Sequence, residues 1–306
     1  MFPDTLLKSD EYLSKLSNYT LDLLNGSEFP SQYLAIGRLL LLSKTDSTAV
    51  NPTDTRPITI NSPIWKLIES CLLCKYEASL WNTISISQIG FRPGCTTQMH
   101  VTELQLQMLR YIKRITNSKI TKKGALIFID FSKAFDSINR EYLMSELIRR
   151  NVFDPADLQL LSWYFTHSAF VYDDTKYHTQ NGVPQGSLLS PLLFTIVLDP
   201  FIRLMESKSI FIYAYADDCA SAVESYNQYN LLMNELERLK TTTNLQWNQK
   251  QTEIMPLNWP TFESGGIKQV NQYKYLGIIL YNKMHPKERK EIMQSKIIKR
   301  IGYFSY

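Results

Sequence analysis

The sequence has few cysteine and histidine residues and no long apolar segment. Only 4 Cys and 4 His occur in 306 residues, and Cys71 and Cys74 form a C-x-x-C with no second pair and no histidine at zinc spacing. We expect both cysteines to pack in a core. Without a disulfide framework or a secretion signal, the protein is expected to be intracellular, either nuclear or cytoplasmic. The longest apolar run, residues 33–42, is interrupted by Arg38 and is too short to span a bilayer, so no membrane partner is expected.

Acidic residues are missing from one long stretch of the chain. No Asp or Glu occurs between Leu104 and Ile129, where the basic residues are Arg110, Lys113, Arg114, Lys119, Lys122 and Lys123. Such a cluster is either a solvated face or a set of contacts to a nucleic-acid backbone. The net charge of +4 permits a polyanionic partner without requiring one.

The remaining composition is that of a globular protein, with 44% hydrophobic residues and no internal repeat or low-complexity linker. Apolar periodicity predicts helices over residues 10–26, 63–82, 97–115, 138–151, 188–206 and 228–243. Strands are expected at 124–130, 209–215 and 219–224, with a hairpin near 171–180. Helices interleaved with a few partly antiparallel strands predict an α+β fold with the helices on one face of a sheet.

The fourth of these helices is expected to begin at a side-chain cap. Asp136 or Ser137 is a suitable cap for it, and Leu143, Leu147 and Ile148 would form its apolar stripe.

Two adjacent carboxylates, Asp217 and Asp218, interrupt the pair of apolar strands FIYAY and CASAV. Taken alone, they fit an ordinary hairpin tip, because Asp is a favoured turn residue. Asp130 is the last residue of the predicted buried strand GALIFID, where a charge is costly unless it is paired or bound to a cation. If the strands are neighbours, three carboxylates converge and favour Mg²⁺, or Mn²⁺, as hard cations. Two such ions support phosphoryl transfer in polymerases and nucleases.

Seven blocks then occur in a fixed order along the chain: RPITINSPIWKLIE, QIGFRPGCTTQMHV, FIDFSKAFDSINREYL, NGVPQGSLLSPLLF, YADD, LQWNQKQTEIM and YKYLGI. In this order the chain resembles the reverse transcriptase domain of non-LTR (LINE-type) retroelements, which is related to group II intron-type reverse transcriptases. The resemblance implies a right-hand polymerase fold in one domain over 1–306. Fingers would lie at about 30–125 and the palm at 125–272, with a primer-grip hairpin and the start of an incomplete thumb at 273–306.

The implied function is that of an RNA-directed DNA polymerase of a retrotransposon, which would bind an RNA template, a DNA or RNA primer and dNTPs. No protein partner is evident. Two alternatives remain open: an RNA-dependent RNA polymerase, and an inactive or truncated scaffold that binds nucleic acid.

By this similarity Asp130 and Asp217 would hold two Mg²⁺ ions, the backbone carbonyl of Phe131 would complete one coordination sphere, and Asp218 would assist catalysis. Asp136, the second acid of DFSKAFD, is expected to be a helix cap and not a metal ligand.

The resemblance also assigns residues to the nucleotide and to the nucleic acid. Phe135 matches the aromatic residue that excludes a 2′-hydroxyl, Gln185 would contact the incoming nucleotide, and Lys44 and Arg56 would bind its triphosphate. The basic residues expected to contact the template-primer backbone are Arg110, Lys113 and Arg114.

One departure from the family pattern is found in NQKQT, where relatives commonly show N-x-x-K-T. Gln251 stands where the lysine proposed to protonate pyrophosphate would be. Lys250 is adjacent but would face the opposite side if this segment were a strand.

Overall fold

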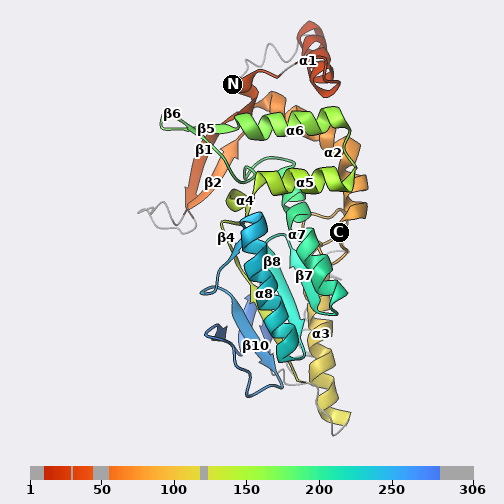
Figure 1. Cartoon of the computed structure of the whole chain (residues 1–306), viewed down its shortest axis with the longest axis vertical. Helices are drawn as coiled ribbons and strands as arrows, with labels where there is room; N and C mark the ends of the chain where they lie inside the picture. Colours follow the sequence, from red (N-terminus) through yellow and green to blue (C-terminus); the bar gives the residue numbers. More distant parts are fainter. Residues whose placement is uncertain (1–9, 29, 44–54, 118–122, 283–306) are drawn as a thin grey trace, which may run out of the picture.

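The computed structural model of the chain describes residues 10–28, 30–43, 55–117 and 123–282. The molecule is elongated, and two sheets follow one another along its long axis (Figure 1). The lower sheet carries the aspartates, whereas the upper sheet is formed by the two N-terminal strands and a later hairpin.

The lower sheet has five strands in the order β11-β10-β3-β8-β7. These strands are β3 (Gly124–Ile129), β7 (Phe211–Tyr215), β8 (Asp218–Val223), β10 (Glu253–Leu257) and β11 (Lys268–Gln269). The central strand β3 is buried along its whole length, as its uninterrupted apolar sequence predicts, and it pairs antiparallel with β8 and β10.

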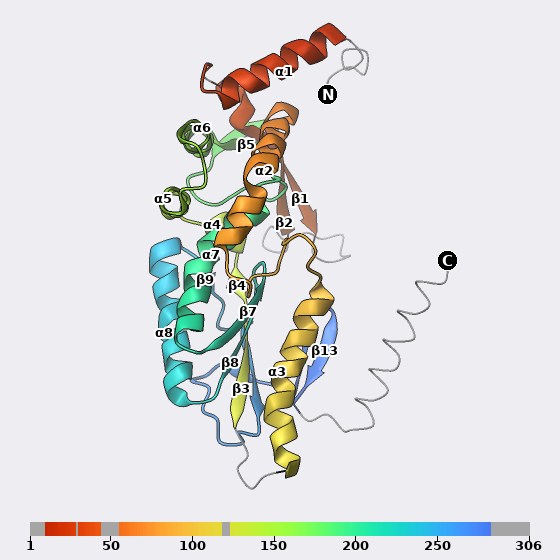
Figure 2. The same cartoon turned by 90° about the vertical axis from the view of Figure 1, so that its right-hand side faces the viewer.

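Helices cover both faces of this sheet (Figure 2). On one face, α7 (Ser190–Ser207) and α8 (Tyr226–Thr243) pack in the larger core with Ile127 and Ile129. On the other face, α3 (Thr97–Asn117) contributes Leu104 to a second core with Leu126 and Phe128. The predicted one-sided arrangement is therefore wrong, because both faces of β3 are apolar and each needs a covering layer.

The upper sheet has the order β2-β1-β5-β6. Its strands are β1 (Ile36–Ser43), β2 (Thr55–Ile60), β5 (Ala169–Tyr172) and β6 (Thr175–His178). The predicted hairpin near 171–180 is thus confirmed as β5–β6, and it joins the N-terminal strands through parallel pairing of β5 with β1. A segment from the range assigned to the palm, 125–272, therefore completes the sheet formed by the range assigned to the fingers.

Four helices lie beside the upper sheet: α1 (Asp10–Leu24), α2 (Pro63–Thr83), α5 (Arg140–Arg150) and α6 (Pro155–His167) (Figure 1). The short elements are η1 (Gln32–Ala35), α4 (Ala134–Ser137), and the strands β4 (Phe131–Ser132) and β9 (Gln246–Trp247), which pair with each other. A final hairpin, β12 (Gln272–Tyr275) and β13 (Ile278–Tyr281), lies where the sequence predicts the primer-grip hairpin.

Three local predictions are corrected by the structure. Asn139 caps α5, since its side chain accepts a hydrogen bond from the Tyr142 N–H, so neither Asp136 nor Ser137 is the cap. Ile148 is 60% exposed and does not continue the buried stripe of α5. Cys74 is exposed on α2, so its predicted burial is wrong, because that position faces away from the packed side of the helix.

None of the helices in the described part of the chain is both long enough and apolar enough to cross a membrane.

Candidate active site

A two-residue turn between β7 and β8 presents the carboxylates of the YADD sequence. Tyr215 pairs with Asp218 across the hairpin, and the turn consists of Ala216 and Asp217. On the other side of β8, Ile129 pairs with Cys219. The next step in that register places Asp130 opposite Asp218. The expected convergence of Asp130 with the YADD turn at one sheet edge therefore follows from strand pairing.

The pKa values of Asp217 and Asp218 both lie above the ordinary value of an aspartate. Burial, followed by the charges of Asp217 and Asp130, raises the pKa of Asp218 to about 6. Burial also raises the pKa of Asp217, and the positive charge of Arg56 opposes that rise. The negative charge gathered at the edge would be stabilised by a bound cation.

The backbone of Asp130 is held from both sides by the segment that follows β9. The Asn248 N–H donates to the Asp130 carbonyl at 2.7 Å, and the Asp130 N–H donates to Thr252 Oγ1 at 3.3 Å. This segment is a turn that precedes β10, so the alternation of a strand does not decide which way Lys250 and Gln251 face. Lys250 is exposed, while the Gln251 amide oxygen accepts a hydrogen bond from the Asn248 side chain.

The donor set at this edge fits a hard divalent cation. Its carboxylates supply oxygen ligands alone, and the neighbouring Phe131 is buried in β4, directly after Asp130. Within residues 10–28, 30–43, 55–117 and 123–282, however, no three His, Cys, Asp or Glu side chains are already grouped as metal ligands. Magnesium binding by Asp130, Phe131 and Asp217 therefore stays a prediction.

The predicted sugar-contacting residue, Phe135, is half-buried and follows Asp130 by five positions. Its ring stacks on Phe194 of α7, with 4.8 Å between the ring centroids, and its carbonyl accepts a hydrogen bond from the Val183 N–H at 2.8 Å. The stacking contact restrains the Phe135 ring, and the backbone hydrogen bond restrains the main chain that carries it.

Gln185 lies in the loop of the GVPQG sequence and bridges α4 and β2. Its Nε2 donates to both carboxylate oxygens of Asp136, at 3.1 and 3.2 Å, and its carbonyl accepts from the Thr59 N–H at 2.7 Å. Asp136 therefore positions Gln185 instead of capping a helix. The sequence missed this role because it depends on a contact between residues 49 positions apart.

Two glycines allow the loop to fit between these elements. A Cβ at Gly182 would lie 2.5 Å from the Asp136 carbonyl oxygen, and one at Gly186 would lie 2.6 Å from the Thr59 carbonyl oxygen. Both glycines also have positive φ angles, which disfavour other residues.

The remaining site residues fall into three groups. Arg56 is exposed on β2, within electrostatic reach of Asp217. Lys44 lies outside the described residues. The residues expected to contact nucleic acid belong to α3 and are Arg110, Lys113 and Arg114. Their side chains lie outside the described part of the structure.

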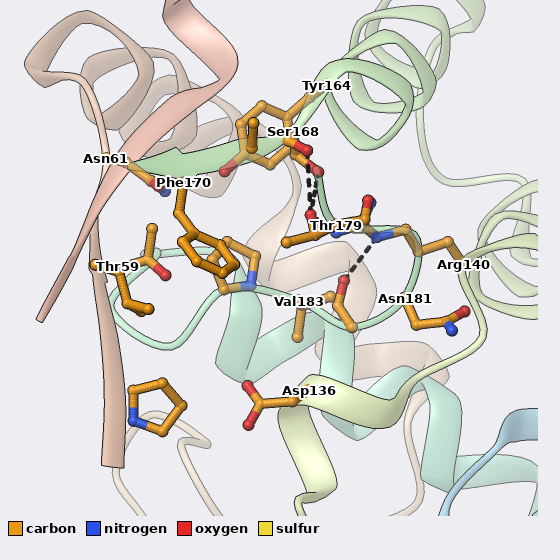
Figure 3. A pocket seen from close by; sticks show the side chains of 15 residues that line it. Thr59, Asn61, Asp136, Arg140, Tyr164, Ser168, Phe170, Thr179, Asn181 and Val183 are labelled. Carbon is orange, nitrogen blue, oxygen red and sulfur yellow. Dashed lines mark hydrogen bonds between the residues drawn. The ribbon is translucent and has the colours of Figure 1, made fainter. Parts of the chain in front are cut away.

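A pocket of about 260 Å³ lies between the upper sheet and the loop that leads to Gln185 (Figure 3). Thr59 and Asn61 of β2 and the loop after it line one wall, Phe170 of β5 lies above, and Asp136 lies at the lower end. Arg140 closes the pocket and donates hydrogen bonds to backbone carbonyls, among them that of Gly182 at 2.8 Å. Burial lowers the pKa of Arg140 to about 10. This arginine therefore holds the loop that carries Gln185.

Further residues that hold the YADD turn were not singled out from the sequence. Gln88 is buried and hydrogen-bonds the backbone of Ala216, and the Tyr275 hydroxyl donates to the Asp218 carbonyl at 2.9 Å. His100 Nε2 lies 2.9 Å from the same hydroxyl. Gln88, His100 and Tyr275 all fall within the quoted blocks, so membership of a block was the available signal.

Aspartates on two neighbouring strands, helices on both faces of their sheet and a second sheet joined through the Gln185 loop define the class of right-hand polymerases. Residues 42–280 match the family described as reverse transcriptase (RNA-dependent DNA polymerase), and the chain belongs to this family.

The similar proteins come from mobile elements, introns and telomerase. The chain is 22% identical over 317 residues to the RNA-directed DNA polymerase from mobile element jockey of Drosophila melanogaster, a match that covers 93% of this chain and 32% of that protein. It is 31% identical over 182 residues to a 91 kDa protein in a cob intron of Schizosaccharomyces pombe, covering 56% and 19% of the two chains.

Telomerase from Candida tropicalis, in complex with a TWJ fragment of telomeric RNA, has a TM-score of 0.57 at 11% identity, over 89% of this chain and 47% of that one. The predicted fold and the resemblance to mobile-element and intron-encoded enzymes are confirmed. The chain spans less than half the length of each of these three proteins.

Proposed function

We propose that this domain is an RNA-directed DNA polymerase that extends a primer with deoxynucleotides on an RNA template. The observation that carries the proposal is the meeting of Asp130 with the Asp217–Asp218 turn at one sheet edge, where burial and then the charges of the other two carboxylates raise the pKa of Asp218. Family membership and the RNA-directed DNA polymerase of jockey support the same reaction.

Asp130, Asp217 and the Phe131 carbonyl would hold two Mg²⁺ ions, and Mn²⁺ has the same ligand preference. Bound there, the ions would activate the primer 3′-hydroxyl and stabilise charge at the α-phosphate of the nucleotide. Asp218, whose carbonyl is held by Tyr275, would add negative charge beside the ligands.

The nucleotide would lie between the aspartate edge and β2. Arg56 would bind its phosphates through a planar guanidinium, Lys44 would assist, and Gln185 would contact the nucleotide and the template base region. Phe135, supported by Phe194, would exclude a 2′-hydroxyl and so favour deoxynucleotides. The template-primer backbone would be contacted by the basic residues of α3, Arg110, Lys113 and Arg114.

The test is primer extension on an RNA template with Mg²⁺, comparing dNTPs with rNTPs and the native chain with Asp217→Asn. We expect dNTP extension that falls ~10³-fold or more in the variant, as removal of a group central to transition-state stabilisation commonly does. The variant should keep its fold, because burial disfavours the charged form of Asp217.

Each alternative predicts a distinct result. Extension with rNTPs at the dNTP rate would indicate an RNA polymerase. No extension by the native chain, with RNA binding retained, would indicate a scaffold. Extension that persists in Asp217→Asn would reject the aspartate edge as the catalytic site.

A further inference from the structure

The segment from Ser85 to Gly90, in the connection between α2 and α3, links helix α7 to the YADD turn (Figure 2). At its first end it is tied to two carboxylates of α7. The Ser85 N–H donates to Asp199 Oδ1 at 2.6 Å, and the hydroxyls of Ser85 and Ser87 both donate to Glu206 Oε1 at 2.6 Å.

The anchoring carboxylate is itself fixed by two cations. Asp199 Oδ2 lies 2.7 Å from the Arg150 guanidinium, which is buried, and 3.0 Å from that of Arg203. Arg92 holds the same segment from behind, since its guanidinium donates to the carbonyls of Ser85 and Gln88 at 2.9 and 3.2 Å. The segment is therefore a rigid support and not a free loop.

At its second end the segment binds the catalytic hairpin. Backbone hydrogen bonds run from the Ala214 N–H to the Ser87 carbonyl at 2.9 Å, and from the Ile89 N–H to the Ala214 carbonyl at 3.0 Å. The next hydrogen bonds to the hairpin come from the side chain of Gln88, which is fully buried. Its Oε1 accepts from the Ala216 N–H at 3.1 Å, and its Nε2 donates to the Ala216 carbonyl at 3.3 Å.

Ala216 is the residue of the turn that needs such support. Its φ angle is +56°, in the left-handed region that a residue with a Cβ adopts at a cost and glycine adopts freely. Asp217 follows directly, so the conformation of Ala216 determines where the Asp217 carboxylate points. A side-chain amide can hold both peptide groups of Ala216, because it carries an acceptor and a donor on one planar group.

We propose that Gln88 is a positioning residue, which holds both backbone groups of Ala216 in the left-handed conformation and so directs the Asp217 carboxylate to the metal site. The proposal rests on the proposed polymerase function for its catalytic consequence. Its structural part concerns the turn alone and can be measured without any activity.

The activity arm compares Gln88→Met, which keeps the side-chain length but has no amide, with the native chain and with Ala216→Gly. We expect Gln88→Met to lower kcat about 10- to 100-fold, which is the effect of losing two hydrogen bonds at a positioned group, with the KM for dNTP changed less than threefold. The Mg²⁺ concentration at half-maximal rate should rise in the variant.

Rescue by a second substitution distinguishes a positioning role of Gln88 from a general loss of folding. Ala216→Gly removes the conformational cost that Gln88 opposes, so adding it to Gln88→Met should recover about fivefold or more of the lost rate, a coupling that a double-mutant cycle measures. Tyr76→Phe serves as the control, because it removes a buried hydroxyl bonded to Asp157, away from the turn. It should lower the melting temperature without lowering kcat.

The structural arm is hydrogen exchange measured by mass spectrometry on peptides spanning 84–93 and 212–219. Because the N–H groups of Gly90 and Ala216 both donate to Gln88 Oε1, both peptides should exchange faster in Gln88→Met. Unchanged exchange, unchanged kcat, or purely additive effects with Ala216→Gly would overturn the proposal. Faster exchange in a chain that shows no extension even in its native form would instead overturn the polymerase function and leave Gln88 as the residue that holds the turn.

Discussion

Gly90 lies directly against the backbone of Ala216. A Cβ at Gly90 would stand 2.7 Å from the Tyr215 carbonyl carbon and closer still to the Ala216 nitrogen, so only glycine fits there. The Gly90 N–H also donates to Gln88 Oε1 at 3.1 Å. The QIG sequence and the YADD turn are thus packed backbone to backbone.

Gly90→Ala is therefore expected to displace the turn. We expect a loss of about 1–3 kcal/mol in the free energy of unfolding, the usual cost of overpacking, together with a fall in primer extension. Urea unfolding and extension assays measure the two effects. Gly94→Ala is the matched control, because a Cβ there meets nothing within 4 Å and the only cost comes from its positive φ. Equal losses of extension in the two variants would contradict close packing as the cause.

Asp136 and Gln185 form a second pair whose disruption should be visible in kinetics. Replacing Asp136 with alanine removes the acceptor of both Gln185 Nε2 hydrogen bonds. Since a hydrogen bond to a charged group contributes about 1.5–3 kcal/mol, we expect the KM for dNTP to rise about tenfold or more, with a smaller change in kcat. Steady-state extension at varied dNTP concentration measures this. Asp136→Asn keeps one acceptor oxygen and should lie between the alanine variant and the native chain.

Phe135→Ala tests whether the Phe135 ring selects the sugar of the incoming nucleotide. Removing the ring opens space above Phe194, so we expect the ratio of rNTP to dNTP incorporation to rise about 10- to 100-fold, within the range that a hydrophobic contact can discriminate. Single-nucleotide incorporation with matched dNTP and rNTP measures the ratio. Ile138→Val serves as a control for core damage, because Ile138 is fully buried nearby in the chain. An unchanged ratio would assign Phe135 to the core alone.

His100 makes folding stability depend on pH. It is fully buried against the Tyr275 hydroxyl and forms T-shaped ring contacts with Tyr213 and Tyr215, and burial lowers its pKa to about 4. The unfolded chain binds a proton at His100 below about pH 6.5, whereas the folded chain does not until about pH 4. The contribution of neutral His100 to the free energy of unfolding is therefore fully present above about pH 6.5. It is lost as the pH decreases from about 6.5 towards 4.

The loss attributable to His100 should reach about 2 kcal/mol at pH 5. Urea unfolding at pH 7.5, 6 and 5, for the native chain and for His100→Gln, measures it as the difference between the two pH profiles. Parallel profiles would show that another group causes the change.

Much of the site could be predicted from the sequence because its chemistry is carried by residues next to recognisable strand ends. Asp130 follows an apolar run that can only be a buried strand, and Asp217 interrupts a pair of apolar strands, so their meeting required only that the strands be neighbours. The predicted cap of α5 was wrong by two or three positions, because Asp136, Ser137 and Asn139 are all suitable caps and the sequence carries nothing that chooses between them.

The sequence by itself determined the local elements, through apolar periods of two and of 3.6 residues, and it determined the family, through the order of seven blocks. Tertiary structure alone decided which polar groups meet. Gln88 and Ala216 are 128 positions apart, and Asp136 meets Gln185 across 49. Such contacts depend on how strands and helices pack in three dimensions, and a side chain's hydrogen-bond partner leaves no periodic trace along the chain.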